Sequence, residues 1–217
     1  KKDQESENDK GVNMSKKVVL IGASGTIGSA TKSKLENSGY EVVPVTYSGS
    51  NGSYTVDIQD IDSIKALFDK IGSFDALVST TGKVTFKEIA ELTQDDWQFS
   101  FNNKLLGQIN LVQIGAKYIN KGGSFTLTTG ILNVEPIALG SVAATVNGGL
   151  EAFVKAASLE YKDFRINAVS PTVVKEALDS YGAFFVGYES VEAEKVANGY
   201  LKSVASITTG SVLNIGF

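Results

Sequence analysis

The sequence predicts an α/β fold: a single doubly wound parallel sheet with helices on both faces. Two observations lead to this prediction. From residue 17 onward, short segments rich in valine and isoleucine alternate with longer segments of helical character, which is typical of right-handed β-α-β units. A glycine-rich stretch also joins the first of these strands to the first helix. The chain shows neither an internal repeat nor a second core, so one domain is expected over residues 16–217.

Each expected strand is a short apolar run bounded by glycine, proline or polar residues. The second run contains Pro44, which cannot donate a backbone hydrogen bond, and this predicts a position toward one side of the sheet. The sixth run is stopped by Pro171. In chain order the expected strands are residues 17–22, 40–46, 54–58, 74–80, 122–130, 164–171 and 211–216.

The expected helices lie between these strands. The first ends at Gly39, a residue type favoured at helix C-termini. The second has an acidic start and large apolar residues along one face. The third is a long region that begins at Thr93, a favourable N-cap, with two aspartates in its first turn. In chain order the expected helices are residues 26–39, 60–72, 93–120, 140–160 and 190–205.

Composition excludes several classes of function. The net charge of −4 argues against nucleic acid or an anionic membrane as the main partner. The chain has no cysteine, which excludes disulfides and thiol chemistry, and no histidine, the commonest general base and metal ligand. No apolar run approaches the roughly 20 residues of a membrane span. We therefore expect a cytoplasmic protein without a metal site.

Residues 1–15 differ from the rest of the chain. They consist largely of charged and amide residues and contain no aromatic residue, so they cannot bury enough apolar surface to order themselves. They also lack the apolar core of a signal peptide. We expect a disordered leader or an expression remnant, with Met14 as a candidate original start.

The stretch VVLIGASGTIGSA places Gly22, Gly25 and Gly28 between the first strand and the first helix. Glycines at such a junction permit a tight turn, close approach to a pyrophosphate, and close packing of helix on strand. The helix N-terminus offers free N–H groups and a partial positive charge to phosphates. The order of strand, loop and helix predicts a dinucleotide site, with the pyrophosphate over Gly25, Thr26 and Ile27.

The segment after the second strand, VTYSGSNGS, indicates which dinucleotide binds. An acidic residue there favours NAD, whereas room and polar donors favour the 2′-phosphate of NADP. No acid lies between Thr46 and Ser53, and Tyr47, Ser48 and Ser50 supply hydroxyl groups. No arginine or lysine of this segment completes a phosphate site. NADP is expected rather than NAD, although a plain glycine/serine turn explains the segment equally well.

With these parts placed, the chain resembles the short-chain dehydrogenase/reductase family, whose members have a Rossmann fold, from residue 17 to the C-terminus. Matching segments are GASGTIG, VDI, VSTTG, RINAVSP and TTGSVLNIGF, and their order and spacing together are specific. The resemblance implies an NAD(P)-dependent oxidoreductase with a small-molecule carbonyl or alcohol as substrate. The expected cofactor contacts are Gly22, Ser24, Gly25, Thr26, Ile27, Gly28, Tyr47, Ser48, Asp57, Ile58, Ser79, Thr80, Gly82 and Pro171.

The same resemblance locates the family's catalytic residues. A tyrosine four residues before a lysine begins the helix after the fifth strand. Matching NGGLEAF to the family's Lys-Ala-Ala-Leu-Glu-Ala-Phe puts Asn147 at the lysine position and Ala143 at the tyrosine position, and the serine position falls on Gly130. Losing a positioned acid or base costs roughly 10²–10⁴-fold in rate. The chain thus resembles the subgroup that keeps the glycine motif and lacks the serine, tyrosine and lysine.

The family also places an asparagine three residues before a glycine in the preceding helix, and this position is Lys104. The lysine and asparagine residue types are therefore exchanged between two positions of the pocket. Lys104 either returns an ammonium group to the pocket floor or is a structural lysine that reaches solvent at a helix kink or a subunit contact, and the sequence favours the second. Thr128 and Thr129 are candidate hydroxyl groups of the pocket, besides Lys104 and Asn147.

Two further expectations follow from the resemblance. Helices 93–120 and 140–161 pair across a two-fold axis in the family, and the small residues of the second predict a homodimer or homotetramer. Residues 171–189 occupy the place of the substrate lid. The aromatic residues Tyr181, Phe184, Phe185 and Tyr188 either cover the substrate or pack on the core.

Three functions remain open on the sequence alone. The first is an NAD(P)-dependent oxidoreductase of unconventional mechanism. The second is a dinucleotide-binding sensor without turnover. The third is a homo-oligomeric, partner-binding protein with a vestigial cofactor site.

Overall fold

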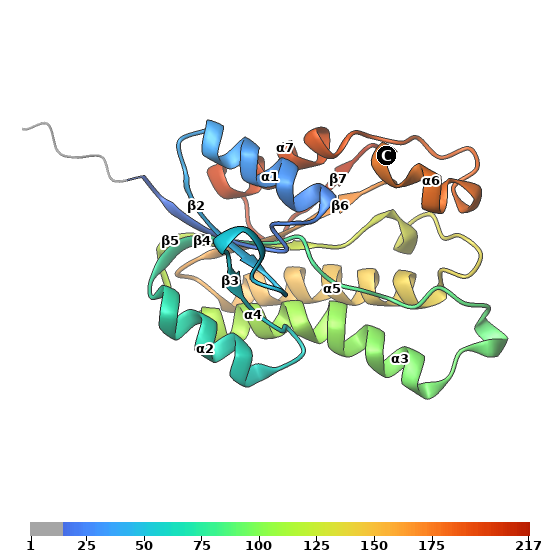
Figure 1. Cartoon of the computed structure of the whole chain (residues 1–217), viewed down its shortest axis with the longest axis horizontal. Helices are drawn as coiled ribbons and strands as arrows, with labels where there is room; N and C mark the ends of the chain where they lie inside the picture. Colours follow the sequence, from blue (N-terminus) through green and yellow to red (C-terminus); the bar gives the residue numbers. More distant parts are fainter. Residues whose placement is uncertain (1–14) are drawn as a thin grey trace, which may run out of the picture.

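The computed structural model describes residues 15–217, so the expected leader lies outside the described residues apart from Ser15. Seven strands form one parallel sheet in the order β3-β2-β1-β4-β5-β6-β7 (Figure 1). This confirms the predicted fold class. The strands are β1 (Lys17–Ile21), β2 (Glu41–Thr46), β3 (Tyr54–Thr55), β4 (Phe74–Ser79), β5 (Ile119–Thr128), β6 (Arg165–Pro171) and β7 (Val212–Ile215).

Helices cover both faces of the sheet. The α-helices are α1 (Thr26–Asn37), α2 (Ile61–Ile71), α3 (Gln94–Ser100), α4 (Gly107–Gly115), α5 (Ser141–Glu160), the short α6 (Leu178–Tyr181) and α7 (Ala193–Ala205). A π-helical turn, η3 (Phe101–Leu106), joins α3 to α4. Single 3-10 turns are η1 (Ser50–Gly52), η2 (Ile89–Glu91), η4 (Ile131–Asn133), η5 (Lys175–Ala177) and η6 (Gly182–Phe184).

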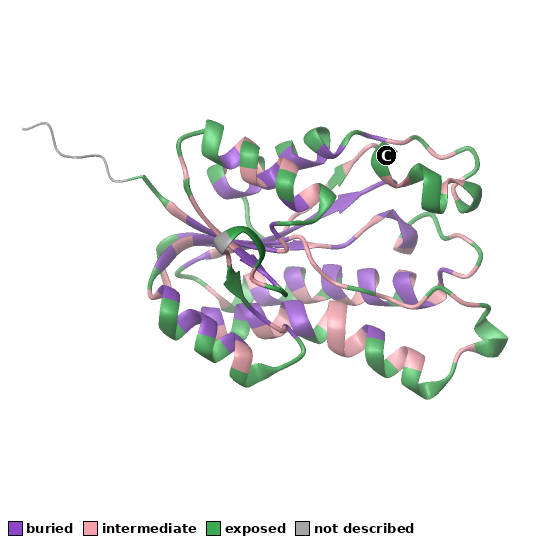
Figure 2. Ribbon diagram, in the orientation of Figure 1, coloured by how far each residue is buried: buried purple, intermediate pink, exposed green. Residues whose placement is uncertain are grey.

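Strand β1 shows how the sheet divides the core. Successive side chains of a strand point to opposite faces. Val19 and Ile21 belong to the larger apolar cluster, which α2, α4 and α5 complete, whereas Val18 and Leu20 belong to the cluster of α1 and α7. Figure 2 shows the same division, with the buried residues concentrated in the sheet and on the inward faces of the helices. Because helices cover both faces of the sheet, a ligand site is expected at the carboxyl ends of the strands.

The place of Pro44 agrees with its chemistry. Strand β2 is second from the edge, and Pro44 lies opposite Leu20 of β1. On its other side β2 pairs with β3 only through Val45 and Thr46. The missing N–H of Pro44 therefore leaves no ladder position unfilled on that side.

The third helical region is where the structure departs most from the prediction. The expected single helix 93–120 is divided into α3, η3 and α4, and it ends at Gly115. Strand β5 begins at Ile119 and not at residue 122, because apolar and asparagine residues before the glycine pair already extend alongside β4. Two other elements are three residues shorter than predicted: β3 holds two residues of the expected 54–58, and α7 begins at Ala193 instead of residue 190.

None of the helices formed by residues 15–217 combines the length and the apolar character that a membrane crossing requires.

Candidate functional site

The glycine loop lies where the strand order reverses. Strand β1 has β2 on one side and β4 on the other, and in such sheets a crevice opens outside the carboxyl ends of these strands. Gly22 has a φ of 84°, in the left-handed region that favours glycine, and its N–H donates to the Val45 carbonyl at 2.9 Å. A Cβ at Gly28 would lie 1.9 Å from the Gly22 carbonyl oxygen. Helix α1 can therefore pack on the loop only with glycine at position 28.

The N-terminus of α1 has open donors. Gly25 is the N-cap, and no side chain caps the helix, so its first N–H groups keep their capacity to bind an anion. A Cβ at Gly25 would have only the Gly22 carbonyl oxygen within 4 Å, at 3.6 Å. The segment from Gly25 to Ile27 thus presents backbone and open space where the sequence predicts the pyrophosphate.

Of two neighbouring expected cofactor contacts, Thr80 braces this loop from behind and Ser79 is buried. The hydroxyl of Thr80 lies 3.0 Å from the Ile21 carbonyl oxygen and 3.1 Å from that of Gly22. Ser79 is fully buried at the end of β4, and its carbonyl oxygen accepts from the Thr128 hydroxyl. In this structure the Thr80 side chain supports the loop, whereas the Ser79 side chain is buried in the core.

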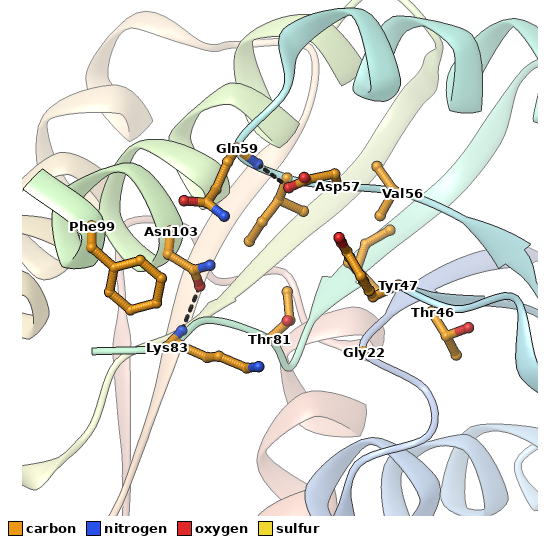
Figure 3. Close-up of a pocket in the computed structure, with 12 residues that line it drawn as sticks. Gly22, Thr46, Tyr47, Val56, Asp57, Gln59, Thr81, Lys83, Phe99 and Asn103 are labelled. Atoms are coloured by element: carbon orange, nitrogen blue, oxygen red, sulfur yellow. Dashed lines mark hydrogen bonds between the residues drawn. The ribbon is translucent and has the colours of Figure 1, made fainter. Parts of the chain in front are cut away.

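A first cavity of about 340 Å³, here called the loop cavity, lies against the glycine loop (Figure 3). Asp57 and Ile58, expected near the adenine, line it together with Tyr47, whose side chain is 79% exposed. An Asp57 carboxylate oxygen accepts from the backbone N–H of Gln59 at 3.0 Å, which holds the carboxylate in place. Ser48 is exposed and lies outside this lining.

A hollow of about 340 Å³ separates α1 from the segment after β2 and is called the α1–β2 hollow. The Thr46 and Ser53 hydroxyls are 2.7 Å apart and bond to each other. Lys32 is the cation of the hollow, with its Nζ 2.7 Å from Glu36 Oε1. The polar residues that line the hollow are Ser24, Ser29, Lys32, Thr46, Ser50, Asn51 and Ser53.

Lys32 was not predicted from the sequence, because a cation for the 2′-phosphate was expected only in the segment after the second strand. The signal that identifies it is helical spacing. Ser29 and Lys32 are three residues apart in α1, and residues at this spacing share a helix face. That face borders the α1–β2 hollow.

A third cavity, the aromatic cavity, has a volume of about 570 Å³. It adjoins the loop cavity, since Lys83 and Phe99 line both. Aromatic side chains contribute much of its wall, from Phe86, Phe99, Tyr181 and Phe185, and most of its other lining residues are apolar. Its polar floor comes from the ends of β5 and β6 and from helices α5 and η3: Lys104, Thr129, Gly130, Asn147, Pro171 and Thr172.

The family's tyrosine, lysine and serine positions all lie around this cavity. Ala143 is 2% exposed and packs against Ile131 and Leu132, so its methyl group belongs to the apolar wall. Asn147, also 2% exposed, donates from Nδ2 to the Gly130 carbonyl oxygen at 3.3 Å, and its Oδ1 has no hydrogen-bond partner. None of these three residues has a side chain that can act as an acid or a base near neutral pH.

Lys104 faces the aromatic cavity, so the sequence-based preference for a solvent-reaching lysine is wrong. Its Nζ donates to the Thr129 carbonyl oxygen at 3.1 Å. Its side chain passes over Gly82, where a Cβ would lie 2.6 Å from Lys104 Cγ. Burial lowers the pKa of Lys104 to about 8. The lysine does lie at a helix irregularity, the π-helical turn η3, a feature frequent at functional sites.

The two threonine hydroxyls do not face the cavity. Thr128 Oγ1 lies 2.6 Å from the Tyr200 hydroxyl on α7, which is on the other face of the sheet. Thr129 Oγ1 donates to Glu151 Oε1 at 3.2 Å inside the core. Thr129 contributes its carbonyl group to the site, as the acceptor of Lys104. Both hydroxyls are therefore structural in this conformation.

In the segment between β6 and α7, some aromatic residues line a cavity and others hold the segment in place. Tyr181 and Phe185 line the aromatic cavity. The Tyr188 hydroxyl lies 3.1 Å from the carbonyl oxygens of Glu135 and Pro136, so this residue anchors the segment to the loop before α5. Phe184 is exposed.

The titratable side chains that line the aromatic cavity are Lys83, Lys104 and Tyr181. Across residues 15–217, no group of three or more acidic, histidine or cysteine side chains is arranged to hold a metal ion. The site thus combines a glycine loop with open backbone donors and an adjoining apolar cavity, and Lys104 is the cation on the cavity floor.

Comparison with known proteins gives consistent matches. Residues 22–209 match the family model described as enoyl-(acyl carrier protein) reductase. A versicolorin reductase from Emericella nidulans is 27% identical over 208 residues, which cover 84% of this chain and 75% of that protein. An L-xylulose reductase from Mesocricetus auratus is 26% identical over 179 residues, which cover 75% of this chain and 73% of that protein.

Solved structures with the same architecture include two informative neighbours. The protein lin1944 from Listeria innocua is 45% identical with a TM-score of 0.89, and the match covers 92% of this chain and 99% of that one. A small-chain dehydrogenase in complex with NADPH is 27% identical with a TM-score of 0.84, and the match covers 93% of this chain and 97% of that one.

Proposed function

Because the chain belongs to the short-chain dehydrogenase/reductase family, we propose that it binds NADP(H) and is an oxidoreductase that works without the family's tyrosine–lysine pair. The observation that supports this most is one continuous arrangement. The glycine loop, the open N-terminus of α1 and two adjoining cavities follow each other along the carboxyl edge of the sheet.

The residues of the loop fit a dinucleotide. Gly22 and Gly28 leave the close approach that a pyrophosphate needs, since a Cβ at either would meet neighbouring atoms at 2.9 Å or less. Gly25, Thr26 and Ile27 would hold the pyrophosphate, and Asp57 and Ile58 the adenine. The nicotinamide would supply or accept a hydride at the aromatic cavity, where Gly82 and Pro171 border its floor.

The preference for NADP rests on the α1–β2 hollow. A 2′-phosphate requires hydroxyl groups and a cation, and Ser24, Lys32 and Ser50 supply both there. The small-chain dehydrogenase that is 27% identical was solved with NADPH, which supports the same choice. Tyr47 and Ser48, exposed after β2, would border the adenosine ribose.

Replacing Lys32 with alanine is expected to weaken NADPH binding about tenfold, which corresponds to about 1.4 kcal/mol, and to leave NADH binding unchanged. The reason is that only NADPH carries the phosphate that Lys32 would contact. The measurement is a calorimetric or fluorescence titration with both cofactors. Lys34→Ala is the matched control, because Lys34 lies on the same helix and points toward Glu194 on α7. Equal losses of affinity for NADPH and NADH would show that Lys32 does not contact the 2′-phosphate.

A second candidate function is a dinucleotide-binding sensor without turnover. It is favoured by Ala143, which fills the tyrosine position with a buried methyl group. Steady NADPH consumption with a carbonyl compound distinguishes the two functions. If NADPH binds saturably and no tested carbonyl is reduced, the sensor function stands. If NADP(H) does not bind at all, the third possibility, a partner-binding protein with a vestigial site, is left.

We also propose a homodimer or homotetramer built on α5 and the α3–α4 region. Among the small residues of helix 140–161, Ala143 and Ala157 are buried in the protomer and are not available for this contact. The outward face of α5 still presents small exposed residues at Ala152 and Ala156, followed by Leu159, which is 73% exposed.

Light scattering at micromolar concentration is expected to give at least twice the protomer mass. Ala152→Arg should shift the protein to monomer, since a long cation at the middle of α5 prevents close helix approach. Ala66→Arg, on the exposed side of α2, is the control and should leave the mass unchanged. A monomeric parent protein would exclude the assembly.

A further inference from the structure

The aromatic cavity holds a lysine without a counter-ion. Lys104 Nζ makes one hydrogen bond, to the Thr129 carbonyl oxygen at 3.1 Å. Within residues 15–217 no carboxylate forms an ion pair with it. An ammonium group has three donors, so two N–H groups of Lys104 remain for a ligand. A desolvated cation of this kind interacts most strongly with an oxygen atom that carries or develops negative charge.

The neighbouring amide shows that the polar floor is incomplete. Asn147 Nδ2 donates to the Gly130 carbonyl oxygen at 3.3 Å. This bond fixes the orientation of the amide, because the reversed amide would oppose two oxygen atoms. Among residues 15–217 the buried Asn147 Oδ1 then has no hydrogen-bond partner. Buried polar atoms are nearly always hydrogen-bonded, so this acceptor is an unsatisfied polar atom directly behind the floor of the cavity.

The wall opposite this floor is apolar and aromatic. Phe86, Phe99, Tyr181 and Phe185 line the cavity together with aliphatic side chains. An apolar ring compound binds favourably when its ring packs against such a wall, because this buries apolar surface. The cavity therefore combines one cation on its floor with a surface suited to an apolar ring.

We propose that Lys104 is the proton donor in the reduction of a carbonyl group carried by an apolar ring compound, whose ring lies against the aromatic wall. This proposal rests on the NADP(H) binding proposed above. The carbonyl carbon gains a hydride from the reduced nicotinamide, and a C–H bond forms as the π pair moves to oxygen. The oxygen takes a proton from Lys104 Nζ. The products are an alcohol and the oxidised cofactor, and the neutral amine of Lys104 regains a proton from solvent.

The acidity of Lys104 suits this role. Since burial lowers its pKa to about 8, the side chain is mostly protonated at neutral pH and close enough to its pKa to release the proton. The reduction rate should be level below pH 8 and fall about tenfold per unit above it. The other titratable groups that face the floor are Lys83 and Tyr181 from the cavity wall and Glu151, which holds Thr129 from α5. Tyr181→Phe should leave the inflection in place.

The test uses 9-fluorenone and the hydrocarbon fluorene, which have the same ring system and differ in the carbonyl oxygen. Binding of both is measured on the full chain without cofactor, and fluorenone reduction is measured with NADPH. Lys104→Met should abolish the preference for fluorenone over fluorene and lower reduction at least about 100-fold. Lys104→Arg, which keeps a donor without the pKa near 8, should retain the binding preference and lose the inflection. Lys65→Met, an exposed lysine of α2, is the matched control.

The outcomes separate this proposal from the proposed function, because NADPH binding is measured for every variant. A parent protein that binds NADPH but neither reduces fluorenone nor prefers it to fluorene overturns the role of Lys104 and leaves cofactor binding intact. Unchanged reduction by Lys104→Met overturns it as well. A parent protein that prefers fluorenone but binds no NADPH overturns the proposed function and the proton-transfer step, while the binding role of Lys104 stands.

Discussion

Valine at position 28 is expected to abolish NADP(H) binding. Its Cβ would lie 1.9 Å from the carbonyl oxygen of Gly22 and 2.9 Å from its carbonyl carbon. Such an approach cannot be relieved by a side-chain rotation, so the loop or the start of α1 must move. Either movement removes the geometry in which backbone N–H groups reach a pyrophosphate. Titration with NADPH should show no saturation up to millimolar concentration.

Gly25→Val separates loss of the site from loss of the fold. A Cβ at Gly25 meets only the Gly22 carbonyl oxygen, at 3.6 Å, which is an ordinary contact. The protein without cofactor should therefore melt within a few degrees of the parent, while NADPH affinity falls at least about 100-fold, or about 2.7 kcal/mol. Thermal melts with and without NADPH measure both quantities. NADPH binding by both glycine variants with the affinity of the parent would place the cofactor elsewhere.

Restoring the family's tyrosine and lysine is expected to be insufficient for turnover of small aliphatic ketones. Ala143→Tyr with Asn147→Lys returns a phenol and a cation to the aromatic cavity. However, Lys104 already bonds to the Thr129 carbonyl, next to the Gly130 carbonyl that Asn147 contacts. Two like charges in a partly desolvated site disfavour each other. The new lysine would lose its proton or its place and could not lower the pKa of the phenol.

Adding Lys104→Asn and Gly130→Ser should relieve this conflict. The first change removes the competing ammonium group. The second supplies a hydroxyl donor for a carbonyl oxygen. A Cβ at Gly130 would lie 3.1 Å from Asn147 Nδ2, and the accompanying change of Asn147 to a flexible lysine removes that tight contact.

The quadruple variant is expected to reduce cyclohexanone about 10²-fold faster than the double variant, within the range that a positioned acid contributes. The rate of NADPH oxidation at saturating cofactor measures this difference. The controls are the two pairs of changes, each made alone in the parent protein. Equal rates in the double and quadruple variants would mean that Lys104 does not interfere with a lysine at position 147. The structure would then have to accommodate both ammonium groups apart from each other.

The fold followed from local patterns because each pattern has a physical cause that acts within a few residues. The apolar runs of β1 and β4 can only be buried on both faces of a sheet, and Gly22 and Gly28 permit a junction that other residues would block. The length of α4 and the start of β5 did not follow. The start of β5 is held by tertiary pairing of Ile119 with Phe74, which no local signal around Ile119 indicates.

The site was less predictable because it depends on where side chains point. Sequence placed Lys104, Thr128 and Thr129 near one another but could not separate their directions. Thr128 bonds toward α7, Thr129 bonds toward α5, and Lys104 alone faces the cavity. Lys32 lay outside the segment in which the phosphate contact was sought, and only the packing of α1 beside β2 brings it there.

The π-helical turn Phe101–Leu106 accommodates one extra residue between α3 and α4. An α-helix advances about 100° per residue, and a π turn holds one extra residue without lengthening the connection. Every side chain before the turn is therefore offset by one position from every side chain after it. Deleting one residue within 101–106 would remove the π turn and join α3 and α4 into one regular helix, whose two halves would keep their present faces. Leu111 and Val112 of α4 would stay buried, and Trp97 and Phe101 would keep their places against the core. The change would fall on the turn itself, which holds Lys104 in its direction into the aromatic cavity.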